Sequence, residues 1–215
     1  MPTSLESLQR KLSLRLETLD SAFRRHAIMP VAVMSTDKFA LQEGLMSSLW
    51  QSWCLFCREV VISSALGAQT QGGVITASPY VGLSEGEIAY ISKVFAKAGP
   101  LKKVISIVHK REEPTWGDIG KLSKIINGLN CSNKSNMATW FGVSNVIPDL
   151  QILRNANAHI NSDNIRDINI IRIKYNQTKY RHPSDSMFWI DPSTNDYLWC
   201  SWISEIDLIA SEVIK

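Results

Sequence analysis

Hydrophobic residues recur every three or four positions near the start of the chain, which is typical of one face of a helix. These positions are Leu5, Leu8, Leu12, Leu16, Leu19 and Phe23. Pro30 should interrupt the pattern, and a second long helix is expected from about Lys38 to Ala65, ended by Gly67. The predicted inner stripe of this helix is Leu45, Leu49, Trp53, Phe56, Val60 and Ser64.

Shorter helices are predicted beyond a glycine-containing loop at 67–83. Ser84 and Glu87 have the spacing of a capping box at a helix start. Pro148 suits the first turn of a helix that ends near His159. Between these two signals the helical pattern covers three segments: 87–98, 119–129 and 136–142.

The last part of the chain has short β-branched and aromatic runs separated by polar turns. Three runs predict two or three antiparallel strands: 168–175, 186–191 and 196–202. Ser204 and Asp207 indicate the start of a last helix. The predicted fold class is therefore mainly α, a helical bundle with a small antiparallel β elaboration near the C-terminus. We expect a single domain over 1–215, with a helical body at 1–165 and the elaboration and last helix at 166–215.

Composition and charge restrict the function classes only moderately. The chain has 215 residues, is 45% hydrophobic, and carries 23 Lys and Arg against 20 Asp and Glu. This small excess does not indicate nucleic-acid binding by bulk charge, so any RNA-binding surface must be local. The charged N-terminal helix lacks the apolar core of a signal peptide, and no segment is apolar enough to cross a membrane. A cytoplasmic protein without membrane partners is the simplest expectation.

Cysteine spacing and common motifs give little indication of a metal or cofactor. Cys54 and Cys57 have a spacing that suits zinc, but the second pair is missing, because Cys131 and Cys200 stand alone. We expect Cys54 and Cys57 to pack in the core. Phosphate-loop, hydrolase-elbow and zinc-protease motifs are also missing from the sequence. Neither a metal nor another cofactor is therefore predicted.

Residues 153–161 read LRNANAHIN and place Arg154, Asn155 and His159 near the end of a predicted helix. On this helix we expect Asn155 and His159 to lie about 40° apart around the axis, and Arg154 about 140° from His159. Arginine offers a permanent cation with forked donors for phosphate oxygens. Histidine can exchange a proton near neutral pH, and asparagine can orient a phosphate or the imidazole. These are groups that metal-independent RNA cleavage through the 2′-hydroxyl requires.

The R-N-x-x-x-H pattern at 154–159, late in a helical chain, resembles the motif of the HEPN superfamily. The resemblance covers residues 5–165 as an architecture and 154–159 as a motif. It implies a HEPN-like helical bundle and endoribonuclease (hydrolase) activity, with Arg154, Asn155 and His159 in the catalytic positions. The family commonly adds an acidic residue from an earlier helix, and the sequence leaves Glu43 and Glu59 both open.

The resemblance also implies partners and a biological setting. One chain supplies one suitable histidine, and similar proteins pair two motif helices across a cleft, which predicts a homodimer with a composite site. RNA is the implied substrate, and an antitoxin or sensor protein is a possible further partner. Toxin-like growth control or antiviral defence is the setting that many similar proteins have.

A second segment interleaves cations with aromatic rings and could contact RNA. Cations can hold phosphates while aromatic faces stack on unpaired bases. The candidate RNA-binding residues are Arg172, Lys174, Tyr175, Lys179, Tyr180 and Arg181. A solvated hairpin is the alternative interpretation of this segment.

Three functions remain open on sequence alone. A metal-independent endoribonuclease is the first, and a catalytically silent HEPN-like module that binds RNA or a protein partner is the second. A small-molecule enzyme on an unrelated helical fold is the least favoured, because the sequence shows no other acid–base cluster.

Overall fold

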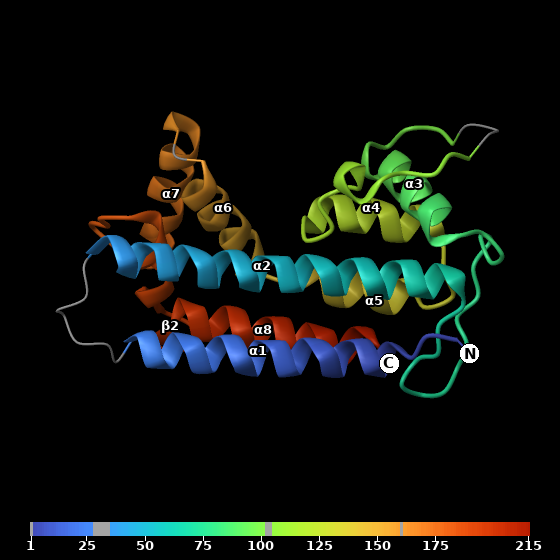
Figure 1. Ribbon diagram of the computed structural model, residues 1–215, viewed down its shortest axis with the longest axis horizontal. Coiled ribbons are helices and arrows are strands. Elements are labelled where there is room, and N and C mark those ends of the chain that lie inside the picture. The colour runs from blue at the N-terminus through green and yellow to red at the C-terminus, as the bar shows by residue number, and fades with distance from the viewer. Residues whose placement is uncertain (1, 28–34, 102–104, 160) are drawn as a thin grey trace. The chain divides into compact units, whose positions relative to one another are not determined.

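The computed structural model describes residues 2–27, 35–101, 105–159 and 161–215 (Figure 1). The protein is mainly helical, with a small two-stranded antiparallel sheet near the C-terminus, as the sequence predicts. The α-helices are α1 (Leu5–Ala27), α2 (Ser35–Leu66), α3 (Glu85–Ala96), α4 (Ile119–Leu129), α5 (Lys134–Gly142), α6 (Ile147–Ala158), α7 (Ser162–Lys174) and α8 (Leu198–Val213). The shorter elements are the 3-10 helices η1 (Lys110–Glu112) and η2 (Pro183–Phe188) and the strands β1 (Ile190–Asp191) and β2 (Asp196–Tyr197).

The two long N-terminal helices lie where the hydrophobic spacing predicts them. In α1 the patterned side chains are buried except Leu8, which is half-buried, and in α2 all six stripe residues are buried. Cys57 is fully buried in the same helix, as expected for a core cysteine, and burial raises the pKa of its thiol. The predicted break at Pro30 lies outside the described residues.

Local end signals fix several of the shorter helices. Ser84 and Glu87 form the predicted capping box at the start of α3. The carboxylate of Asp118 accepts a hydrogen bond from the backbone N–H of Lys121 at the start of α4. Pro148 lies in the first turn of α6, where its missing N–H costs no helical hydrogen bond. At the starts of α3 and α4, side chains therefore satisfy otherwise unpaired backbone N–H groups, whereas α6 begins without a side-chain cap.

The predicted strand at 168–175 is wrong, because these residues form most of α7. Asn161 caps this helix by accepting a hydrogen bond from the backbone N–H of Asn164. Ile168 and Ile171 are buried, whereas Ile170 and Ile173 are 63% and 71% exposed. Burial three residues apart is helical periodicity, so packing of one face outweighs the strand preference of the isoleucines.

The other two predicted strands are helical in part. In 186–191 only Ile190 and Asp191 belong to a strand. The segment up to Phe188 belongs to η2, which His182 caps together with Asp185. In 196–202 only Asp196 and Tyr197 pair with β1, and α8 begins directly afterwards at Leu198. The last helix therefore starts earlier than Ser204, and its Trp199 and Trp202 are fully buried.

Two compact units make up the chain, and their sequence segments alternate. The first unit contains Met1–Leu12, Trp53–Ser144 and Leu208–Lys215. The second unit contains Ser13–Ser52 and Asn145–Asp207. Every residue of the two candidate sites belongs to the second unit.

The first unit has a buried arginine at the centre of a group of carboxylates. Arg58 Nε donates to Glu113 Oε2 at 2.6 Å, and its Nη atoms donate to Glu85 and Glu59 at 2.7 and 2.8 Å. The hydrogen bond with Glu113 is the main cause of the raised pKa of Arg58. Burial works against ionisation of Glu113, but hydrogen bonds from Arg58 and Trp116 lower its pKa overall. Glu59 is therefore engaged in a structural ion-pair network.

The second unit has an aromatic core beside its polar elements. The ring of Phe23 on α1 stacks on Trp199 of α8 with centroids 5.1 Å apart, and it lies 5.3 Å from Phe188 of η2. Ser184 at the start of η2 is fully buried and donates a hydrogen bond to Gln42 Oε1 on α2 at 2.7 Å. These contacts fix η2 against α1, α2 and α8.

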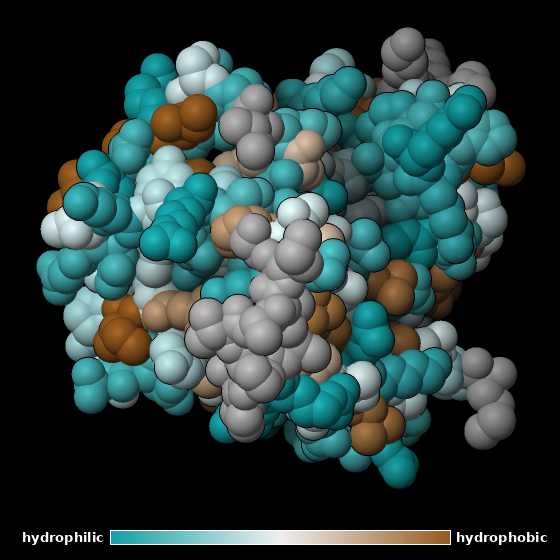
Figure 2. Space-filling model, turned by 60° about the vertical axis from the view of Figure 1, so that its left-hand side comes forward, coloured by the Kyte–Doolittle hydropathy of each residue, from teal (hydrophilic) through white to brown (hydrophobic). Residues whose placement is uncertain are grey.

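The surface in Figure 2 is mainly hydrophilic, with hydrophobic residues in separate spots among polar ones. None of the helices in the described part of the chain is long and apolar enough to span a membrane.

Candidate functional site

Helix α6 carries the R-N-x-x-x-H motif at its C-terminal end. Arg154 and Asn155 lie in the last turns, and the helix ends at Ala158, so His159 is its C-cap with φ −144° and ψ 88°. The N–H of His159 still donates to the carbonyl of Asn155 at 2.9 Å. Because the backbone leaves the helical conformation at His159, the angles expected for a continuing helix do not apply to this residue.

Arg154 is half-buried and lines a cavity between α2 and α6. The cavity has a volume of about 300 Å³ and is lined by Ala40, Glu43, Gly44, Ser47, Arg154, Asn157 and Ala158. Arg154 Nη1 donates to the side-chain oxygen of Asn155 at 3.3 Å. The two adjacent motif residues therefore contact each other, and Asn155 helps to orient the guanidinium.

The structure separates the two acidic residues that the sequence left open. Glu43 shares the cavity with Arg154, whereas Glu59 belongs to the Arg58 network of the first unit. Glu43 Oε1 also lies 3.2 Å from His182 Nε2, and the His182 ring stacks on Phe39 with centroids 4.6 Å apart. Glu43 is therefore the carboxylate positioned near the motif arginine.

His159 is exposed and does not line the Arg154 cavity. Its carbonyl accepts a hydrogen bond from the side-chain amide of Asn164 in α7, which holds the backbone where α6 ends. Its imidazole thus lies at an accessible helix end. Within one chain, the structure therefore places Arg154 in this cavity and His159 outside it.

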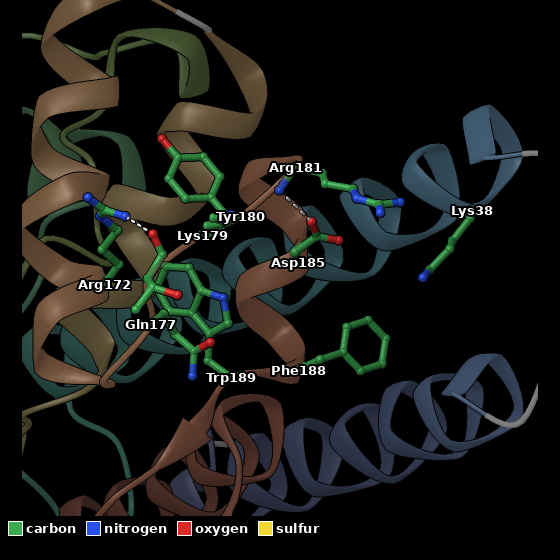
Figure 3. A pocket seen from close by; sticks show the side chains of 10 residues that line it. Lys38, Arg172, Gln177, Lys179, Tyr180, Arg181, Asp185, Phe188 and Trp189 are labelled. Carbon is green, nitrogen blue, oxygen red and sulfur yellow. Dashed lines mark hydrogen bonds between the residues drawn. The ribbon is translucent and has the colours of Figure 1, made fainter.

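The candidate RNA-binding residues divide into two groups in the structure. Arg172, Lys179, Tyr180 and Arg181 line a second cavity, of about 730 Å³, which we call the cation–aromatic pocket (Figure 3). Lys174 and Tyr175 do not line it. Four of the six candidate RNA-binding residues of the sequence therefore line one cavity.

Lys174 and Tyr175 bind a buried carboxylate instead. Lys174 Nζ and the Tyr175 hydroxyl both donate to Asp149 Oδ2, each at 2.6 Å. Burial, together with the hydrogen bond to Asp149, raises the pKa of Tyr175 far above its usual range. Tyr175 is only 1% exposed, so its ring offers no face to a base.

Several residues of the cation–aromatic pocket were not recognised in the sequence. The sequence predicts Phe188 and Trp189 only as part of a strand at 186–191, and Lys38 only as the beginning of a helix. Asp185 and Gln177 also line the pocket, and no sequence motif indicates them. The basic run that contains Arg172, Lys179 and Arg181 is the local sequence signal for this pocket. Lys38 belongs to α2 and lies far from that run in the sequence, so no local pattern connects the two.

Comparison of the chain with models of protein families, with curated proteins and with solved structures found no match. Among the described residues, no group of three or more His, Cys, Asp or Glu side chains is arranged to hold a metal ion.

Proposed function

We propose that the protein is a metal-independent endoribonuclease of the HEPN type, with Arg154, Asn155 and His159 in its active site. The observation that carries the proposal is the end of α6, where a motif arginine held by its neighbouring asparagine precedes an exposed histidine. Glu43 shares the cavity with Arg154, so the proposal assigns the supporting acidic position to Glu43.

The reaction follows from the chemistry of RNA. His159 removes the proton of a 2′-hydroxyl, the 2′-oxygen attacks the phosphorus, and the bond from phosphorus to the 5′-oxygen breaks. Arg154 stabilises the negative charge that develops on the phosphate oxygens. A second proton-transfer group must protonate the leaving 5′-oxygen, and His159 of a second copy supplies it in a homodimer. The products are a 2′,3′-cyclic phosphate and a 5′-hydroxyl.

The experiment incubates purified protein with a labelled single-stranded RNA and with the all-deoxy version of the same sequence, both in EDTA. We expect cleavage of the RNA alone, with cyclic phosphate ends. His159→Ala and Arg154→Ala should each lower the rate by about a hundredfold or more. His109→Ala is the matched control, because His109 is exposed in the first unit. Cleavage of the deoxy substrate, or wild-type rates in both motif variants, would contradict the proposal.

The second candidate is a catalytically silent module that binds RNA or a protein partner. It is favoured by the separation of His159 from the Arg154 cavity within one chain. In that case the His159→Ala protein would bind RNA like the wild type, and neither would cleave it.

Toxin-like growth control, antiviral defence and an antitoxin or sensor partner belong to the endoribonuclease proposal. If the cleavage is toxic, mild expression of the wild type slows cell growth and that of His159→Ala does not.

A further inference from the structure

The cation–aromatic pocket is built from distant parts of the second unit. Lys38 comes from α2, Arg172 from α7, Lys179 and Arg181 from the following loop, and Phe188 from η2. Figure 3 places Lys38 opposite Arg172, with Asp185 and Phe188 between them. A volume of about 730 Å³ lies within the range of small-molecule sites in proteins.

Positive charge dominates the pocket lining, which has four cations and one carboxylate. Asp185 Oδ2 already accepts backbone hydrogen bonds from Arg181 and His182, at 3.0 and 3.1 Å. Lys179 and Arg181 are exposed, and neither forms an ion pair within the described residues. An anionic group is therefore the natural complement of this lining.

Arg172 is oriented and retains an unused donor. One of its Nη atoms donates to the carbonyl of Thr178, which fixes the guanidinium to the loop. Its Nε is buried and has no hydrogen-bond partner in the described part of the chain. Arg172 therefore contributes a fixed positive charge to the pocket lining, although its buried Nε is not within reach of a ligand there.

Aromatic rings beside these cations are held by the core. Phe188 lies 5.3 Å from Phe23 and 5.9 Å from Tyr197, and Tyr180 packs edge-on against Trp189 at 6.4 Å. Lys38 Nζ lies 5.7 Å from the centre of the Phe188 ring, so a charged group and a flat apolar face adjoin each other. A simple anion would use only the cations, whereas a ligand with a planar ring and a phosphate would use both features.

We infer that the cation–aromatic pocket binds one phosphorylated nucleoside, with its phosphate on the cations of Lys179 and Arg181 and its base against the ring of Phe188 or Tyr180. The nucleoside is either a free mononucleotide or one residue of an RNA chain. The inference does not depend on cleavage at Arg154 and His159, because the pocket shares no residue with the motif cavity.

Calorimetric titration of the full chain with 5′-AMP, adenosine, ribose 5-phosphate and inorganic phosphate tests this inference. We expect 5′-AMP to bind about tenfold more tightly than each of the other three, since only it offers both phosphate and base. Equal binding of 5′-AMP and ribose 5-phosphate would overturn the inference and leave a plain anion site. Failure to bind 5′-AMP would overturn it as well.

Three variants of the pocket locate the binding. Lys179→Ala/Arg181→Ala should weaken 5′-AMP binding about tenfold or more, because two charge-assisted contacts are lost. The matched control Arg10→Ala/Lys11→Ala removes the same charge from exposed positions of α1 and should bind like the wild type.

Phe188→Leu keeps an apolar side chain in the core but removes the ring. Because the base lies against either Phe188 or Tyr180, one of Phe188→Leu and Tyr180→Leu should weaken 5′-AMP binding. The same variant should leave the binding of ribose 5-phosphate unchanged. If the pocket pair binds 5′-AMP like the wild type, or if neither ring variant weakens its binding, the inference is wrong.

The source of the nucleotide is distinguished with the His159→Ala protein, which avoids cleavage. An adenine pentaribonucleotide that displaces 5′-AMP identifies RNA as the source, and failure to displace it identifies a free nucleotide. Either result agrees with the inference. If 5′-AMP binds but no RNA is cleaved, the proposed function fails alone, whereas cleavage without 5′-AMP binding overturns the pocket inference alone.

Discussion

His26 places an imidazole inside the aromatic core of the second unit. It is 5% exposed, its ring lies 6.1 Å from that of Phe188, and neither ring nitrogen has a hydrogen-bond partner among the described residues. Burial lowers the pKa of His26 below its ordinary value of 6.5, and the charge of Lys38 acts in the same direction. The folded protein therefore favours the neutral ring.

A pH-dependent stability follows at this residue. Below pH 6.5 the unfolded chain takes up the His26 proton more readily than the folded chain, so the free energy of unfolding falls as the pH falls. His26→Phe should reduce this loss between pH 8 and pH 5, and urea unfolding at both pH values measures it. At pH 8 the variant should be at least as stable as the wild type, because carbon replaces unpaired buried nitrogens. An unchanged pH dependence in His26→Phe would contradict this assignment.

At the residue scale the sequence identifies candidate side chains better than it identifies their surroundings. Arg172, Lys174 and Tyr175 are neighbours in one basic and aromatic run. Yet Arg172 faces the cation–aromatic pocket, whereas Lys174 and Tyr175 bind Asp149. Neighbours on a helix point in different directions, and here the direction depends on where Asp149 of α6 lies. The sequence contains no local signal for that.

Helix α3 shows how an element can be specified by its own end. Ser84 Oγ accepts from the N–H of Glu87 at 3.4 Å, and Glu87 Oε2 accepts from the N–H of Ser84 at 2.8 Å. Hydrogen bonds that the backbone N–H and the hydroxyl of Ser84 donate to the carboxylate of Glu87 lower its pKa. The signal is local, so both residues could be read from the sequence.

Removing the cap should destabilise the protein measurably. We expect Ser84→Ala to lower the free energy of unfolding by about 1 kcal/mol, because helix-end N–H groups lose their acceptor. Ser84→Asn is the matched control, since asparagine also caps helices well, and it should stay close to the wild type. Chemical denaturation of the three proteins makes the comparison. Equal losses in both variants would indicate that packing, not capping, accounts for the role of Ser84.

Helix α7 shows the opposite case at the same scale. Its run of isoleucines predicts a strand, and no residue inside the run argues for a helix. The deciding facts are the Asn161 cap and the burial of Ile168 and Ile171 within the second unit. The burial of the two isoleucines is a tertiary effect, because packing of one helix face can outweigh the low helix propensity of β-branched residues. Strand and helix cannot be separated for such a run by composition alone.

At the scale of the whole molecule, the main helices could be predicted but the pockets could not. Periodicity predicts α1 and α2, yet it does not indicate which part of α2 meets α6 or η2. Glu43 and Lys38 reach different cavities although they lie about one helical turn apart in sequence. The cavities depend on contacts between remote segments, which hydrophobic spacing does not encode.

The proposed composite site makes a prediction about the active assembly. A homodimer whose interface includes α6 would supply two copies of His159, and Ile170 and Ile173 expose apolar surface on the adjoining α7. Because His159 is an exposed C-cap residue, His159→Ala should preserve the dimer while abolishing cleavage. Mass in solution should therefore be twice that of one chain for both proteins.

Mixed dimers distinguish a composite site from two independent ones. Co-expression of equal amounts of wild type and His159→Ala should give dimers of which about one quarter carry two intact copies of His159. If both histidines serve one phosphate, as base and as acid, cleavage falls to about one quarter of the all-wild-type rate. If each subunit acts alone, it falls to about one half. The two co-expressed chains carry different purification tags. The control is a co-expression of two wild-type chains with the same pair of tags. Cleavage at one half, or full activity in a monomer, would contradict a shared site, because one His159 would then suffice for both proton transfers.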